Sequence, residues 1–259
     1  MKALRRIAAQ SLHKAPPVEA LDREDVRTQT VLGIDVSARR GLDLVVLDVG
    51  RQLAADPVRI LADTVAGQLE DTLKRLAPSV IAIDAPSQWG IAGPTRSAEL
   101  SLRRRGLSCY STPSDPSRRS HPFYAWVLVG LAVHEAADRA GFPVYDGHGP
   151  VAGRAVEVFP HAAAVALRGM RPPPGWRRTA SGKRAWRLAA LAAAGVVDHR
   201  LRSQDQIDAA LAAVTASAAL AGAVDVLGDP VDGVIVVPRQ GASHWARNAQ
   251  KCRSEAQIR

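Results

Sequence analysis

Residues 30–49, TVLGIDVSARRGLDLVVLDV, contain the first two structural elements that the sequence predicts. Apolar, largely β-branched runs at 31–36 and 42–49 have the composition of buried strands. The short connection at 39–41 contains a glycine, so we expect a β-hairpin. Residues 51–59 then predict a short third strand beside it.

Beyond this hairpin the pattern alternates between helices and strands. Leucine and valine at helical spacing predict a helix over 61–76, and 80–83 reads as a strand buried on both faces. A strand over 155–159 completes a five-stranded mixed sheet, and 234–237 predicts a last short strand. We expect the other helices at 96–105, 123–140, 161–168, 182–194 and 203–221, with an irregular segment at 108–122.

Composition narrows the class of protein. The chain has 259 residues, 47% of them hydrophobic, which suits a soluble globular domain. We divide it into an N-terminal arm (1–28), one α/β domain (29–238) and a basic tail (239–259). Two cysteines exclude a disulfide-rich scaffold or a cysteine-rich zinc module. No apolar run is long enough for a membrane span, and cytoplasmic residence is the simplest expectation.

Acidic residues lie at the ends of different predicted elements. Asp35 and Asp84 each follow an apolar strand, Glu157 lies in the strand at 155–159, and Asp205 and Asp208 open the last long helix. A carboxylate at the end of a buried strand is costly unless water, a cation or a donor meets it. Hard cations such as Mg²⁺ and Mn²⁺ prefer oxygen ligands, so the pattern predicts a divalent metal site.

The two helix acids also have a structural interpretation. Ser203 and Gln206 form a capping-box pattern in which Asp205 would merely complement the positive end of the helix dipole. That interpretation does not cover Asp208, which lies in a helix apolar on nearly all sides. A spacing of three places both carboxylates on one helix face.

The strand acids have structural alternatives as well. Asp35 or Asp84 alone could accept hydrogen bonds from a neighbouring turn, but two strands would then finish on aspartate by coincidence. Glu157 is open between a metal ligand, an accessory base and a partner for Arg154. We therefore predict that the catalytic residues are Asp35, Asp84, Asp208 and Glu157, and that the metal ligands are Asp35, Asp84, Asp205 and Asp208.

The net charge of +9 favours polyanionic partners. We predict that nucleic acid contacts Arg96, Arg103, Arg104, Lys183 and Arg187. The structural alternatives are a cation-rich last helical turn for Arg103 and Arg104, and a solvated helix face for Lys183 and Arg187.

Taken in order, these motifs resemble the DUF429 family, usually described as predicted nucleases of the ribonuclease H-like superfamily. The matching pieces are GIDVS (33–37), AIDAP (82–86), Arg96 with Glu99 and RRRG (103–106), EVFPH (157–161), DQIDAA (205–210), and GDP (228–230) with GVIVVP (233–238). The resemblance implies three antiparallel strands followed by helix-linked parallel ones. It also implies that Asp35, Asp84 and Asp208 hold one or two divalent cations for phosphodiester hydrolysis.

Two other functions remain open at this point. A nucleic-acid-binding protein without catalysis would also account for the basic arm and tail. An actin-type ATPase fits less well, because VSARR (36–40) is a poor phosphate loop after the first strand. The sequence is equally compatible with DNA and RNA, and it leaves the oligomeric state open.

Overall fold

The computed structural model describes residues 29–48, 50–61, 65–176 and 179–240. The predicted arm at 1–28 lies outside these residues. So does the predicted tail, apart from Arg239 and Gln240. None of the helices in the described ranges is long and apolar enough to cross a membrane.

A five-stranded mixed sheet forms the centre of the fold. Its strands are β1 (Thr30–Ser37), β2 (Gly41–Asp48), β3 (Val58–Ile60), β4 (Val80–Asp84) and β5 (Arg154–Glu157). They are ordered β3-β2-β1-β4-β5. The β1–β2 and β2–β3 pairs are antiparallel, whereas β1–β4 and β4–β5 are parallel. This is the ribonuclease H-like arrangement, and the predicted fold class is confirmed.

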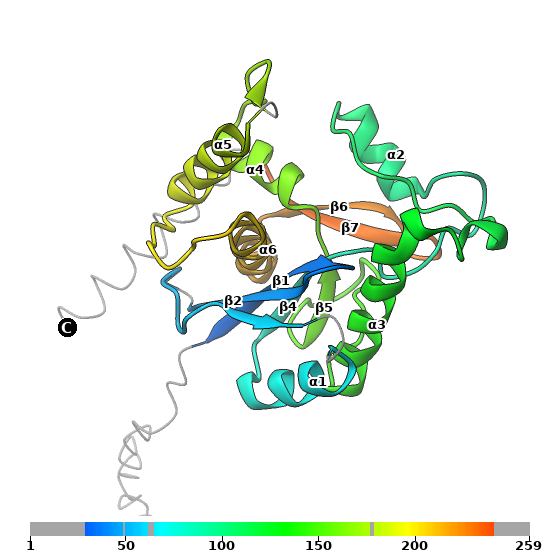
Figure 1. Ribbon diagram of the computed structural model, residues 1–259, viewed down its shortest axis with the longest axis horizontal. Coiled ribbons are helices and arrows are strands. Elements are labelled where there is room, and N and C mark those ends of the chain that lie inside the picture. Colours follow the sequence, from blue (N-terminus) through cyan, green and yellow to red (C-terminus); the bar gives the residue numbers. More distant parts are fainter. Residues whose placement is uncertain (1–28, 49, 62–64, 177–178, 241–259) are drawn as a thin grey trace, which may run out of the picture.

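Helices cover both faces of this sheet (Figure 1). Helix α6 (Gln204–Leu220) lies directly on one face, with α4 (Pro160–Arg168) and α5 (Ala180–Ala193) packed against it. On the opposite face lie α1 (Val65–Leu76) and α3 (Ala125–Arg139). Alternate residues of the strands therefore enter two separate hydrophobic cores.

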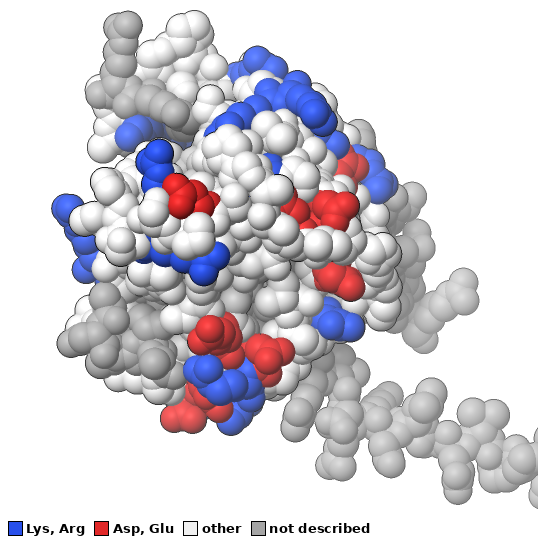
Figure 2. All heavy atoms as spheres, turned by 90° about the vertical axis from the view of Figure 1, so that its right-hand side faces the viewer, with Lys and Arg blue, Asp and Glu red and all other residues white. Residues whose placement is uncertain are grey.

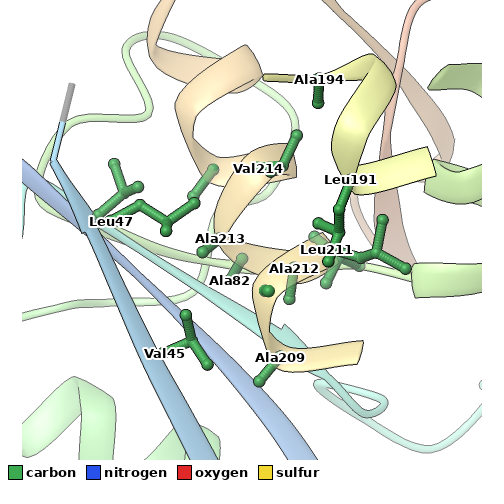
Figure 3. Packing of buried hydrophobic residues seen from close by; sticks show 14 of the residues in the cluster. Val45, Leu47, Ala82, Leu191, Ala194, Ala209, Leu211, Ala212, Ala213 and Val214 are labelled. Atoms are coloured by element: carbon green, nitrogen blue, oxygen red, sulfur yellow. The ribbon is translucent and has the colours of Figure 1, made fainter. Parts of the chain in front are cut away.

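The approach of α6 to the sheet depends on small residues. A Cβ atom at Gly33 would overlap the backbone of Ala209 and Ala213 in α6, so glycine allows the helix to touch β1. Figure 3 shows the short alanine side chains of α6 beside Val45 of β2 and Ala82 of β4. This close contact brings the first turns of α6 to the strand ends.

A β-hairpin and one helix form a third, smaller layer. Strands β6 (Val224–Asp229) and β7 (Gly233–Pro238) make a separate antiparallel sheet, against which α2 (Ser97–Arg104) packs. The sequence predicted β7 as a short strand but not its partner β6. The strand pattern of β6 is weak because acidic residues and Gly228, at φ +113°, interrupt its apolar alternation.

The remaining elements differ from prediction mainly at their ends. The helix predicted over 61–76 is described from Val65, and the third strand forms at Val58–Ile60 rather than across 51–59. A 3₁₀ turn, Pro122–Tyr124, precedes α3 because proline favours the first position of a helical turn and cannot extend one backwards. A second such turn, Pro116–Arg118, lies within the segment predicted to be irregular.

Candidate functional site

Two aspartates, one buried and one half-buried, face each other across neighbouring parallel strands. Asp35 of β1 and Asp84, the last residue of β4, are register partners in the parallel ladder. Strand alternation places both on the face that α6 covers, with Val31 and Ala82 two residues before them in the same core. Asp35 is only 9% exposed. The fold therefore brings these two predicted site residues together.

The surroundings of these two carboxyl groups carry more negative than positive charge. Burial raises the pKa of Asp84 to about 7; nearby Arg187 opposes this rise and Glu157 adds to it. The pKa of Asp35 is raised well above its ordinary value. Burial is the largest cause, and repulsion from Asp84 and Asp205 adds to it. Two neighbouring carboxyl groups favour retaining a proton when no cation separates them.

Asp43 is a third acid at this position and was not singled out by sequence reasoning. It lies in β2 opposite Asp35 and is 2% exposed. Arg59 of β3 donates to both of its oxygens, at 2.6 Å from Nη2 to Oδ2 and 3.3 Å from Nε to Oδ1. The available signal was a charged residue inside the apolar run of β2. Its charge is met by arginine, so we regard Asp43 as a structural ion pair.

The capping box of α6 is present, and the Asp205 carboxylate contacts two arginines. Ser203 Oγ accepts from the Gln206 amide at 3.0 Å. The Asp205 carboxylate lies 2.8 Å from Arg40 and 3.5 Å from Arg59. Asp205 therefore acts on Asp35 by repulsion through space while its own charge is already paired.

Asp208 makes an ion pair with Arg187 of α5. Gln204 Nε2 also donates to both Asp208 oxygens at 3.3 Å. The Arg187 charge lowers the pKa of both Asp35 and Asp84. Its guanidinium therefore stabilises the ionised forms of these two predicted metal ligands as well as that of Asp208. Sequence reasoning assigned Arg187 to phosphate contact and missed this role, since residues 21 positions apart meet only through the packing of α5 on α6.

Glu157 lies apart from the aspartate pair. Its register partner Ile83 belongs to the α1/α3 core, so alternation directs Glu157 to the face opposite α6. Arg96 donates to its two oxygens at 2.9 and 2.5 Å, and the backbone and hydroxyl of Ser87 donate at 2.8 and 3.0 Å. With both oxygens occupied, Glu157 joins the loop after β4 to α2.

The prediction that Arg96 contacts nucleic acid is wrong. Its side chain is 1% exposed and also donates to Glu99 at 3.1 Å, so it is a buried cation between two carboxylates. Burial would raise the pKa of Glu99, but the Arg96 charge and the Thr112 hydrogen bonds outweigh it and hold this pKa low. Arg103, Arg104 and Lys183 do lie exposed on the surface, where their predicted contacts are sterically open.

The donor set suits a hard divalent cation in its chemistry. Asp35 and Asp84 supply adjacent oxygen ligands, and metal binding requires both carboxyl groups in their ionised form. In the described ranges, however, no three His, Cys, Asp or Glu side chains converge closely enough to hold a metal ion. The third acid, Asp208, is bound by Arg187 instead. Asp84 also lines a cavity of ≈ 280 Å³, through which a small ligand could reach the pair.

Comparisons with known proteins place the chain in a family. Among solved structures, Thermus thermophilus RuvC aligns at 17% identity, covering 78% of this chain and 99% of that one, with a TM-score of 0.43. T. thermophilus RuvC in complex with Holliday junction substrate aligns at 17% identity, covering 75% and 96%, with a TM-score of 0.41. No curated protein matches the sequence. The model of "Protein of unknown function (DUF429)" matches residues 33–233, and the chain therefore belongs to this family.

Proposed function

We propose that this protein is a divalent-metal-dependent phosphodiesterase, specifically a nuclease, whose centre is the Asp35–Asp84 pair. The observation that carries the proposal is that Asp35 and Asp84 are register partners on neighbouring parallel strands, where burial raises the pKa of both carboxyl groups. Each unit of such a shift disfavours the ionised form in the folded protein by about 1.36 kcal/mol. Perturbed carboxylates of this kind concentrate at functional sites.

The residues of the site have distinct proposed roles. Asp35 and Asp84 would hold Mg²⁺ or Mn²⁺, with Asp208 as a third ligand once Arg187 turns from it. Such a cation supplies Lewis-acid activation of water and neutralises charge on a leaving oxygen. Arg187, released from Asp208, is placed to bind the phosphate of a substrate, because a guanidinium matches phosphate oxygens well.

The two accessory acids act through other residues. Asp205, already paired with Arg40, keeps the local potential negative and raises the pKa of Asp35. Glu157 positions the loop that follows Asp84 by binding Ser87 and Arg96. We propose that neither contacts the reacting phosphate, so replacing either should weaken the site through its geometry or its charge.

Nucleic acid is the proposed substrate because of charge and access. The chain carries a net charge of +9, and Arg103, Arg104 and Lys183 are exposed on helices near the site. Positive side chains of this kind bind phosphates and position a strand without reading its sequence. Figure 2 shows Lys and Arg side chains in several groups on the face that carries α2.

The direct test is cleavage of labelled single-stranded, duplex, hybrid and branched nucleic acids with Mg²⁺, Mn²⁺ or EDTA. We expect cleavage that requires the metal and is lost in both Asp35→Asn and Asp84→Asn. Asp71→Asn, at an exposed position of α1, is the matched control and should cleave like the unaltered protein. Cleavage that persists in EDTA or in Asp84→Asn would refute the assignment.

One observation favours a second candidate, a nucleic-acid-binding protein without catalysis. Arg187 already neutralises Asp208, as a structural ion pair would. Under this alternative, salt-sensitive binding survives Asp35→Asn and Asp84→Asn, and no metal or substrate gives cleavage. The same panel of substrates therefore decides between the two functions.

A further inference from the structure

Aromatic residues concentrate around the cavity beside Asp84. Tyr110 and Trp126 line the cavity, and Phe123, Tyr124 and Trp89 extend from them through ring contacts. They come from the loop after β4, the loop after α2 and the start of α3. Three segments separated in sequence therefore contribute to one aromatic cluster.

The cluster forms a continuous row of ring contacts. Trp126 contacts Tyr110 with 6.1 Å between ring centroids, Tyr110 contacts Phe123 at 5.4 Å, and Phe123 contacts Tyr124 at 5.0 Å. Tyr124 in turn contacts Trp89 at 5.9 Å. We call these five residues the aromatic row. It begins at the cavity and ends on the surface.

The exposure of the row argues against a purely structural role. Tyr110 is 69% exposed and Phe123 is 48% exposed, so folding leaves much of their apolar surface in water. A row that served only to hold the loop would bury these rings. Contiguous exposed aromatic surface instead marks a binding site.

The positive charge at the outer end of the aromatic row indicates the class of ligand that would bind. The Arg119 guanidinium lies 5.6 Å from the Trp89 ring centroid, and Arg118 is exposed beside it. Arg103 and Arg104 are exposed on the neighbouring helix α2. A ligand that offers flat rings to the row and negative charge to the arginines matches a nucleic-acid strand with unpaired bases.

The cavity provides a place for one such base. Tyr110 and Trp126 line it together with Val36, Phe159 and Asp84. Its volume of ≈ 280 Å³ is near the lower limit of ligand-binding clefts, about 300 Å³, and so suits a single ring system.

We propose that the cavity beside Asp84 receives one unpaired nucleobase and that the aromatic row stacks against neighbouring bases of the same strand. This deepens the proposed function and rests on it for placing a phosphodiester close to Asp84. The protein would then require single-stranded or locally unpaired nucleic acid. DNA and RNA share this chemistry.

Binding of a labelled single strand in EDTA tests the proposal without cleavage. Anisotropy would be compared between a normal oligonucleotide, as DNA and as RNA, and an abasic strand of the same length and charge. We expect the normal strand to bind more tightly. Tyr110→Ala should weaken its binding by roughly 5- to 150-fold, the typical value of one base–aromatic stack, and leave the abasic strand unaffected.

Matched variants separate stacking from other effects. Tyr110→Phe keeps the ring and should bind normally. Val197→Ala, an 81% exposed apolar residue elsewhere, is the control for surface truncation. Equal affinity for normal and abasic strands, or an unchanged affinity in Tyr110→Ala, would overturn the proposal.

The two proposals fail in different ways. Metal-dependent cleavage with equal binding of normal and abasic strands would sustain the nuclease and reject the base pocket. Binding that prefers normal strands, without cleavage under any metal condition, would sustain the pocket and reject the nuclease.

Discussion

The raised pKa of Asp84 predicts that removing this carboxyl group stabilises the protein. In Asp84→Asn the side chain keeps its size and its hydrogen-bonding capacity but cannot ionise. Burial raises the pKa of Asp84 from its ordinary 3.8 to about 7. In the folded protein this group therefore retains its proton over a range of pH in which the unfolded chain has lost it.

The sign and size of the effect follow from proton linkage. A carboxyl group with a raised folded-state pKa contributes stability at low pH, and that contribution disappears as pH rises through the folded-state pKa. A shift of roughly three units at 1.36 kcal/mol each is about 4 kcal/mol. We expect Asp84→Asn to exceed the unaltered protein by up to about 4 kcal/mol at pH 8, and by roughly 1–2 kcal/mol at pH 5.

Urea unfolding in EDTA at both pH values measures this difference, with Asp71→Asn as the exposed control. Adding Mn²⁺ at pH 8 should stabilise the unaltered protein and leave Asp84→Asn unchanged, because a ligand stabilises only the state that binds it. A difference that is the same at pH 5 and pH 8, or a less stable Asp84→Asn at pH 8, would refute the reasoning.

Three further outcomes follow from packing and charge. Arg96→Met leaves Glu157 without its partner and should cost about 3–5 kcal/mol in urea unfolding, whereas a loss below 1 kcal/mol would contradict a buried ion pair. Gly33→Ala should cost at least about 1–3 kcal/mol because its Cβ meets the backbone of α6, whereas Gly67→Ala, open on an α1 surface, should be neutral or stabilising. Arg187→Met should tighten Mn²⁺ binding at pH 8 by about tenfold, measured by electron paramagnetic resonance; weaker binding would show that Arg187 does not compete with the metal.

The strands and helices could be predicted from the sequence because their signals are local. The strands β1, β2 and β4 consist largely of apolar residues. The alanine-rich sequence of α6 predicts a buried helix, and the capping box at Ser203 predicts where it begins. Strand β6 escaped prediction because Gly228 and its acids hide the alternation, and its pairing with β7 is a non-local contact.

The candidate site divides in the same way. That Asp35 and Asp84 meet was predictable, since aspartates at the ends of adjacent parallel strands share an edge of the sheet. The pairing of Arg187 with Asp208 was not, because it depends on how α5 packs against α6. The same holds for Arg96, which sequence reasoning placed on the surface and the fold buries between Glu99 and Glu157.

The sequence alone therefore determined the family, the order of elements and the acids that flank the strand ends. Each of these features can be predicted from residues close together in the sequence, through apolar periodicity, a helix cap or a carboxylate that follows a strand. Only the tertiary structure decided which charges neutralise one another and which aromatic rings border the cavity beside Asp84. Those features depend on distances between segments far apart in the chain, and such distances are set by the packing of helices on the sheet.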